Sequence, residues 1–367
     1  MLNLFCLLLA LIPTLENGRM APLLEDIGKA HVIPTDEGWV TLSELTDENQ
    51  TLYSDEIFDR IKQGDYTALE EGYATLAKKP LTKSQSKTIS YPSIQKLKVE
   101  LFFSKAPLLP ILFSLYLIAT LSRARYIFIA ALSLHTLLLI GRCYILSRPP
   151  VSNMMETILY VPWIAALTAL FNKHIFAGSL CSSALLLFLP PHQTFETVQA
   201  VLDSSYWLSI HVLLIVGSYG ILIFAGILAH FYLVREKYFD TLINTLYIGT
   251  ALLIVGTILG GVWAAQSWGR FWDWDPKEAW AFISALTYLG FLHAYKFRKI
   301  KKSGLAIGSI IGLLTISFTW YGVNYILGTG LHSYGFGSGG QWIYYCYIGA
   351  EVGFIILHRP IKKILYK

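Results

Sequence analysis

Charged residues are scarce in this chain. Only 14% of its 367 residues are Asp, Glu, Lys or Arg, whereas 54% are hydrophobic, and the mean hydropathy is +0.51. Average soluble domains carry about 25% charged residues, so this composition excludes an ordinary soluble protein and indicates a membrane protein. The formal net charge of +5 does not indicate a nucleic-acid partner, because most Lys and Arg after residue 106 occupy short loops between apolar runs.

Paired cysteines are also lacking. The four cysteines, Cys6, Cys143, Cys181 and Cys346, form no CxxC pair, no zinc-ligand spacing and no CxxCH site for covalent haem. These absences exclude a thiol oxidoreductase and a c-type cytochrome. The Gly-rich stretch GFGSGG at 335–340 has neither the preceding strand nor the Lys of a phosphate-binding loop, and we interpret it as a flexible outer loop.

Composition divides the chain into four parts. Residues 1–13 are apolar but shorter than the ~20 residues that cross a bilayer, so a signal peptide, a weak anchor and the remnant of a longer segment all remain open. Residues 14–106 hold most of the Asp and Glu, and we expect an extracytoplasmic region that is either a spacer with a small helical subdomain or a binding region. Residues 107–358 are predicted to be a transmembrane domain, and residues 359–367 a basic cytoplasmic tail.

Apolar runs within 107–358 predict an all-α integral membrane protein, a polytopic bundle of about nine transmembrane helices. The loops that carry Lys and Arg fall on one side by parity, and the positive-inside rule makes that side cytoplasmic. The opposite loops, including the tryptophan-rich stretch 263–280, then face outward together with residues 14–106. The predicted spans are 107–122, 126–146, 155–171, 174–190, 206–234, 241–263, 278–295, 304–326 and 342–358.

Tryptophans concentrate in one of the predicted outer loops. Half of the chain's ten tryptophans lie between Trp263 and Trp280. A belt of interfacial aromatic residues accounts for one or two tryptophans in such a place. The density here favours a large, flat, apolar ligand, and WGRFWDW at 268–274 is predicted to form the apolar floor beneath it.

The continuation DPKEAW holds two acidic residues three positions apart. Asp275, Pro276 and Glu278 fit the N-cap, N1 and N3 positions of a helix, where both carboxylates accept otherwise unpaired backbone N–H groups. A carboxylate pair for acid–base catalysis is the alternative. We favour the cap and predict no catalytic residue there.

Histidines suggest what the aromatic surface binds. His211 lies about one turn into the fifth predicted span on its outer side, and His332 lies in the outer loop GTGLHSYGFG. Two imidazoles beside flat apolar rings suit an iron porphyrin, which takes an axial nitrogen on each face. His293 lies at the inner end of the seventh span, where it is placed to bind a ligand that arrives from the cytoplasm. For His135, His174, His192, His230 and His358 we favour packing, helix-end or loop roles.

The stretch WGRFWDWDPKEAWAFI at 268–283 resembles the tryptophan-rich WWD segment of membrane proteins that handle haem. Its sequence is most similar to that segment in the CcsA (ResC) family of system II cytochrome c biogenesis. Four other segments resemble that family in the same order: RPPVSNMMET, LSIHVLLIVGSYGIL, FLHAYK and GVNYILGTGLHSYGF, at 148–157, 208–222, 291–296 and 322–336. The resemblance covers about residues 107–358.

That resemblance implies a function and a site. The family takes haem b from the cytoplasmic side of the bacterial inner membrane, moves it outward and presents it to the reduced CxxCH motif of apocytochrome c. It implies axial haem-iron ligation by His211 and His332 outside and by His293 within the membrane. It implies a haem-binding segment made of Trp268, Gly269, Trp272, Trp274, Asp275, Pro276, Glu278 and Trp280. A CcsB (ResB) partner, which supplies a second transmembrane histidine, and a thioredoxin-like thiol reductant are implied as well.

Other interpretations stay open at this point. A respiratory subunit with structural haem b would place both iron ligands of one haem within spans, and a solute permease with an aromatic vestibule would bind no haem. The system I proteins CcmC and CcmF share a tryptophan segment, but the DPKEAW continuation fits CcsA better. Arg270 and Lys277 are candidates to pair with haem propionates, or they face solvent or lipid headgroups.

Overall fold

The structure is a computed structural model of the chain. It describes residues 33–35, 38–40, 95, 99, 102–103, 106–187, 204–330 and 341–365. The chain forms two compact units, residues 1–111 with 190–195, and residues 112–189 with 196–367.

In the first unit the described residues include a short antiparallel pair of strands, β1 (Ile33–Thr35) and β2 (Gly38–Val40), in which Ile33 pairs with Val40. No pattern in the sequence predicts these two short strands, and the described elements of the second unit are all helical. The helical pattern expected at 55–79 and the apolar residues 1–13 lie outside the described residues.

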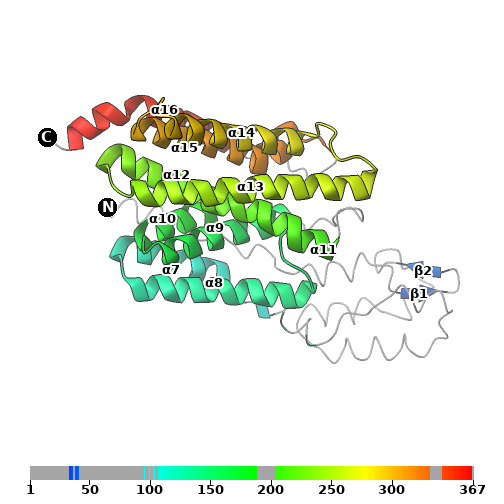
Figure 1. Cartoon of the computed structure of the whole chain (residues 1–367). Coiled ribbons are helices and arrows are strands. Elements are labelled where there is room, and N and C mark those ends of the chain that lie inside the picture. Colours follow the sequence, from blue (N-terminus) through cyan, green and yellow to red (C-terminus); the bar gives the residue numbers. More distant parts are fainter. Residues whose placement is uncertain are drawn as a thin grey trace. The chain divides into compact units, whose positions relative to one another are not determined.

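From residue 108 onward the described chain is helical, and a described helix coincides with each predicted span (Figure 1). The π-helical segment η5 continues into α12, and η6 follows directly on α15. The elements are α7 (Leu108–Ser122), α8 (Arg125–Leu146), α9 (Met154–Phe171), α10 (Ile175–Leu186), α11 (Ser205–Trp207), η5 (Leu208–Val212), α12 (Leu213–Arg235), α13 (Phe239–Trp268), α14 (Pro276–Lys296), α15 (Lys302–Ser317), η6 (Phe318–Leu327) and α16 (Gln341–Leu365).

Five of these helical stretches are long and apolar enough to cross a membrane: Arg125–Leu146, Met154–Phe171, Leu208–Arg235, Phe239–Trp268 and Lys302–Leu327. Two more, α7 and α10, are apolar but shorter. The described residues thus form a multi-pass helical membrane protein with five candidate spans.

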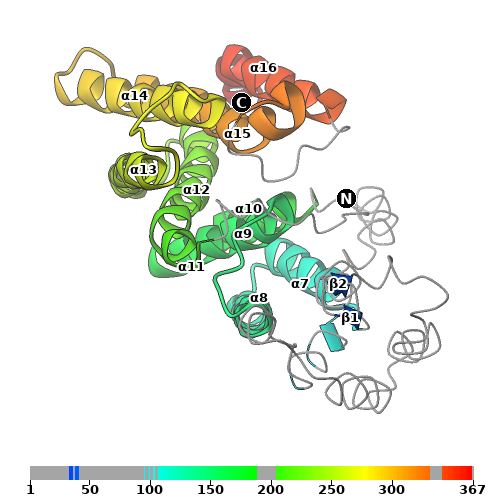
Figure 2. The same ribbon diagram turned by 90° about the vertical axis from the view of Figure 1, so that its right-hand side faces the viewer.

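The helix that runs through η5 and α12 is the centre of the second unit. Of its most apolar stretch 78% is buried, against 39% for α8 and for α13. It packs against α9 and α10 on one side and against α13, α15 and α16 on the other (Figure 2). Small residues allow the close approach to α13: a Cβ on Gly249 would lie 2.6 Å from the side chain of Leu222.

The basic loops lie together at one end of the helices. Arg123, which precedes α8, lies over the ring of Phe176 at 5.0 Å, and the Nε2 atom of His174 lies 2.9 Å from the hydroxyl of Thr241. Lys362 near the end of α16 pairs with Glu236 between α12 and α13. The connection between α13 and α14, with its tryptophans, is at the opposite end (Figure 1). The predicted parity of the loops is confirmed for these connections.

Candidate functional site

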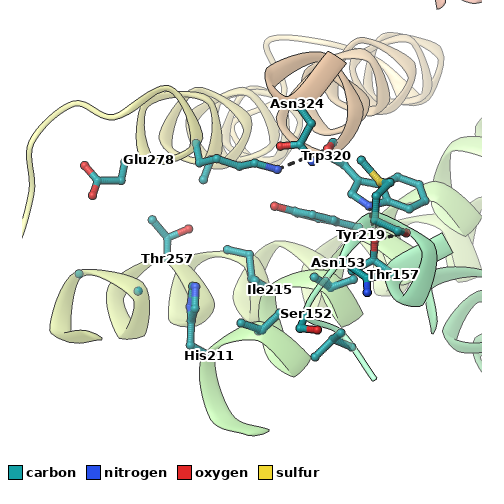
Figure 3. Close-up of a pocket in the computed structure, with 18 of the residues that line it drawn as sticks. Ser152, Asn153, Thr157, His211, Ile215, Tyr219, Thr257, Glu278, Trp320 and Asn324 are labelled. Carbon is teal, nitrogen blue, oxygen red and sulfur yellow. Dashed lines mark hydrogen bonds between the residues drawn. The ribbon is translucent and has the colours of Figure 1, made fainter. Parts of the chain in front are cut away.

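A pocket opens at the tryptophan end of the helices, with an empty volume of about 780 Å³ including its mouth. Its walls come from the start of α9, from η5 and α12, from α13, and from α14 with η6 (Figure 3). The lining residues are Val151, Ser152, Asn153, Met154, Thr157, His211, Val212, Ile215, Val216, Tyr219, Thr257, Gly260, Gly261, Trp272, Lys277, Glu278, Ala281, Trp320 and Asn324.

His211 enters this pocket from a π-helical turn, a local widening that often marks functional sites. Its Nδ1 atom lies 2.8 Å from the carbonyl oxygen of Gly256 on α13. Because a carbonyl oxygen only accepts, Nδ1 carries the proton of the neutral ring and Nε2 carries the lone pair. Metal-binding histidines commonly donate their other ring N–H to a carbonyl in this way.

Glycines on α13 make room for the histidine. A Cβ on Gly260 would lie 2.7 Å from Cε1 of His211 and 3.2 Å from both ring nitrogens. At the next position, a Cβ on Gly261 would lie 2.5 Å from the ring of Phe271. Gly256 and Gly260 are four residues apart and lie on one face of the helix, so the carbonyl of Gly256 accepts from the imidazole while the absence of a side chain on Gly260 leaves room for its ring.

Two further tryptophans stand behind His211. The rings of Trp207 and Trp263 stack with centroids 6.3 Å apart and planes inclined by 13°, and the Trp263 ring meets the imidazole edge-on at 5.8 Å. The indole N–H of Trp207 donates to Oε1 of Gln266 at 2.9 Å. Both tryptophans are buried, so they fix the position of the histidine rather than offer a free surface.

The tryptophan-rich segment is partly helical. α13 continues to Trp268, past the predicted end at 263, because nothing in AAQSW interrupts it before Gly269 ends the helix with φ of +71°. Beyond this turn, the rings of Trp272 and Trp274 are perpendicular, at 89° with centroids 5.9 Å apart. The predicted flat floor is therefore a corner of rings, of which Trp272 lines the pocket and Trp274 is 70% exposed.

The acids at the start of α14 form a helix cap, as predicted. The Asp275 side chain accepts a hydrogen bond from the backbone N–H of Lys277 at 3.1 Å, and Pro276 is the first helical residue. Oε2 of Glu278 accepts from the backbone N–H groups of Asp273 and Asp275 at 2.9 and 3.3 Å. Both carboxylates thus stabilise the helix start, which agrees with the cap rather than with a catalytic pair.

The start of α9 forms the opposite wall. The hydroxyl of Thr157 accepts a hydrogen bond at 2.9 Å from the indole N–H of Trp320, which lies on η6. Behind this wall the buried carboxylate of Glu156 accepts from the N–H and the hydroxyl of Ser152, at 2.8 and 2.9 Å, and lies 3.4 Å from the guanidinium of Arg142 on α8. These contacts fix the first turn of α9 against both neighbouring elements.

The structure separates the two basic residues of the segment. The guanidinium of Arg270 pairs with Asp273 outside the pocket. Lys277 lines the pocket instead, and its ammonium donates to the carbonyl oxygen of Trp320 at 3.4 Å. Lys277 lies outside the five candidate spans, and its burial lowers the pKa of the ammonium to about 8, an effect partly opposed by the charge of Asp275.

The predicted site residues do not all gather in this pocket. His211, Trp272 and Glu278 line it, whereas Trp268 and Gly269 end α13, and Trp280 packs on the ring of Phe318 at 4.1 Å. His293 is exposed in the last turn of α14, at the end where the basic loops lie, with Nδ1 2.8 Å from the carbonyl of Leu289. His332 and the stretch GFGSGG lie outside the described residues.

Two other histidines have the predicted packing roles. His135 is fully buried on α8, with Nδ1 3.2 Å from the hydroxyl of Tyr116 and Nε2 2.9 Å from the carbonyl of Leu159. His230 on α12 contacts Glu351 on α16 at 2.9 Å. Both side chains hold neighbouring helices together. His358 is buried within α16, and His192 lies outside the described residues.

Sequence reasoning missed much of the pocket wall. The pocket is lined by Asn153, Thr157, Lys277 and Asn324 among others. Of these four, only Lys277 was predicted as a site residue, as a possible partner of a haem propionate. The spacing of Gly256 and Gly260 was a usable signal, because two small residues four apart on an apolar helix indicate close contact with a neighbour. The contact between Trp320 and Thr157 had no local signal, since 163 residues separate the two.

Fold and site together define a multi-pass helical membrane protein with a histidine held over a tryptophan-edged pocket. Residues 108–332 match the family described as "Cytochrome C assembly protein". The chain belongs to this family of cytochrome c biogenesis proteins and is of the CcsA type, so the resemblance seen in the sequence is confirmed.

Relatives agree with this assignment. The chain is 33% identical over 291 residues to protein NrfI of Wolinella succinogenes, covering 67% of this chain and 32% of NrfI. It is 31% identical over 218 residues to the cytochrome c biogenesis protein CcsA of Chlamydomonas reinhardtii, covering 51% of this chain and 61% of the relative. For CcsA of Chlorella vulgaris the identity is 29%, with 56% and 84% covered. The match thus spans about a third of NrfI and less than two thirds of the Chlamydomonas protein.

Proposed function

We propose that this protein moves haem b across the bacterial inner membrane and presents it at the tryptophan end for covalent attachment to the CxxCH motif of apocytochrome c. The observation that carries the proposal is the placement of His211 in the pocket. Its Nδ1 is hydrogen-bonded to the carbonyl of Gly256, which places the lone pair of the neutral ring on Nε2, the atom that would ligate iron, and Trp272 lines the same pocket. Gly260 provides the space that the imidazole occupies.

The pocket residues fit an iron porphyrin as substrate. His211 would hold the haem iron through Nε2, and we assign the second iron-ligating histidine to His332. Trp272 offers apolar ring surface at the pocket edge, with Trp274 perpendicular beside it. When bound, the haem supplies its vinyl groups: each acceptor thiol adds across one C=C bond, so that a C–S bond forms, the thiol proton ends on the neighbouring carbon and no oxidant is consumed.

The chain's own part in this reaction is to orient and to shield. When the porphyrin is held in one position beside the entering thiols, the entropy cost of bringing the two reactants together in the correct orientation is met by binding rather than in the reaction step. No side chain of the pocket is needed as nucleophile, because the thiols come from the acceptor. We therefore propose that the protein acts as the haem-presenting subunit of a cytochrome c synthase, with a thioredoxin-like protein keeping the acceptor thiols reduced.

Entry is proposed at the opposite end. His293 is exposed there on α14, near the basic loops. We propose that it ligates incoming haem together with a histidine of a CcsB/ResB-type membrane partner. With nine membrane crossings and the basic loops in the cytoplasm, the tryptophan end faces outward. We propose the same roles as before for the remaining parts of the chain: a signal or anchor at 1–13, an extracytoplasmic region at 14–106 and a cytoplasmic tail at 359–367.

Maturation of a reporter cytochrome tests the proposal. The full chain is expressed with a CcsB-type partner and an apocytochrome in cells that lack their own maturation system, and covalent haem is scored on the apocytochrome. We expect maturation with the wild type, loss of it in His293→Ala, and recovery when imidazole is supplied. His174→Ala, which alters a histidine at the same end that contacts Thr241, is the matched control and keeps activity. Absence of covalent haem with the wild-type pair would contradict the proposal.

A further inference from the structure

The pocket has a polar side that the histidine does not explain. Lys277, Trp320 and Thr157 follow one another through hydrogen bonds, from the ammonium to the Trp320 carbonyl and from the Trp320 indole to the Thr157 hydroxyl. Asn324 lies one turn beyond Trp320 on η6, and Asn153 lies one turn before Thr157 on α9. Figure 3 shows Asn324 and Trp320 across the pocket from His211. These residues join α9, α14 and η6 around one volume.

Asn324 is the clearest sign that this side receives a ligand. Its side chain is 2% exposed, it lines the pocket, and its Oδ1 atom is buried without a hydrogen-bond partner. Buried amide groups nearly always have hydrogen-bond partners, because a buried amide without one has lost its hydrogen bonds to water and gained none in the protein. The amide can turn so that either its oxygen or its NH₂ group faces the ligand.

Two other polar side chains on this side can donate hydrogen bonds. The Oδ1 atom of Asn153 accepts the backbone N–H of Glu156 at 2.9 Å, so its NH₂ group is the end that remains to donate elsewhere. Lys277 contributes an ammonium and is the only Lys or Arg among the described lining residues. An ammonium beside amide donors is suited to a carboxylate, since charge-assisted hydrogen bonds to carboxylates are the strong ones.

We propose that Lys277, Asn324 and Asn153 form a subsite for a propionate carboxylate of the porphyrin, an inference that rests on the proposed function. Haem carries its propionates on one edge and its vinyl groups on the other half of the ring. Binding of the propionates at Lys277 directs the vinyl groups away from the α9 wall. The subsite thereby sets which edge of the macrocycle is presented to the acceptor thiols.

Esterified haem tests this subsite. The full chain is purified in detergent, and binding of ferric protoporphyrin IX and of its dimethyl ester is titrated by absorbance. The ester keeps the iron and the ring but has no carboxylate. We expect the wild type to bind the free acid about tenfold or more tightly than the ester, the range of a hydrogen bond to a charged group. Lys277→Met removes most of this preference, and Lys277→Arg retains it.

Arg270→Met is the matched control, because Arg270 belongs to the same segment but pairs with Asp273 outside the pocket, and it keeps the wild-type preference. Asn324→Leu weakens the preference without abolishing binding. Equal affinity of the wild type for acid and ester, or an unchanged preference in Lys277→Met, overturns the subsite while the proposed function stands. Failure of the wild type to bind either porphyrin overturns both.

Discussion

Gly260→Ala tests how tightly α13 holds the His211 ring. The added Cβ would lie 2.7 Å from Cε1 of the imidazole, whereas ordinary contact begins near 3.4 Å, so the ring or the helix must retreat by about 0.7 Å. The ring cannot retreat without straining its 2.8 Å bond to the Gly256 carbonyl. Functional geometry is commonly lost beyond about 0.5 Å.

The stability effect of this change is smaller than its effect on ligation. Overpacking costs about 1–3 kcal/mol, and replacing Gly by Ala inside a helix returns up to about 1 kcal/mol. We therefore expect Gly260→Ala to fold and to purify, with iron ligation by His211 weakened. Gly349→Ala on α16 is the matched control, since nothing lies within 4 Å of a Cβ added there.

Absorption and electron paramagnetic resonance spectra of the purified variants measure the outcome. For Gly260→Ala we expect a shift from low-spin towards high-spin iron and a lower haem content, whereas Gly349→Ala keeps the wild-type spectrum. If Gly260→Ala has the same spin state and haem content as Gly349→Ala, the close fit between Gly260 and the His211 ring does not control iron ligation.

Three further predictions concern the framework around the pocket, and thermal unfolding of the purified protein checks each. Glu156→Gln removes the buried carboxylate that both Arg142 and Arg148 face and is expected to cost about 3–5 kcal/mol, and an unchanged melting temperature would contradict this. Asp275→Ala removes a helix cap and is expected to lower the free energy of unfolding by about 1 kcal/mol, whereas Asp275→Asn stays near the wild type. Equal stability of the wild type and both variants would show that the cap contributes nothing. Gly269→Ala forces a side chain into a left-handed conformation at φ of +71°, so a loss of about 1–2 kcal/mol is expected, and an unchanged melting temperature would contradict it.

The helices and the cap could be predicted because their signals are local. Apolar runs of sufficient length place each helix, and the order Asp275, Pro276, Glu278 is enough to place the start of α14. The end of α13 was predicted five residues early, because the hydropathy falls before Gly269 ends the helix. Local pattern thus fixed which segments are helical better than where each one stops.

The pocket could be predicted only in part because its walls are tertiary. His211 is placed by its span, but the tautomer depends on the Gly256 carbonyl, 45 residues later. The angle between Trp272 and Trp274 follows from packing that includes Phe282 on α14. Asn153 and Asn324 line one pocket because α9 and η6 meet at the hydrogen bond between Thr157 and Trp320, a contact that no short sequence pattern predicts.

The haem content of the purified protein shows whether His211 ligates haem iron. The wild type, His211→Ala and the matched control His174→Ala are purified as full chains, and bound haem and its absorption bands are measured with and without added imidazole. We expect haem with six-coordinate bands in the wild type and in His174→Ala. In His211→Ala we expect loss of haem or of its sixth ligand, with recovery in imidazole. Wild-type haem content and bands in His211→Ala would contradict iron ligation by His211.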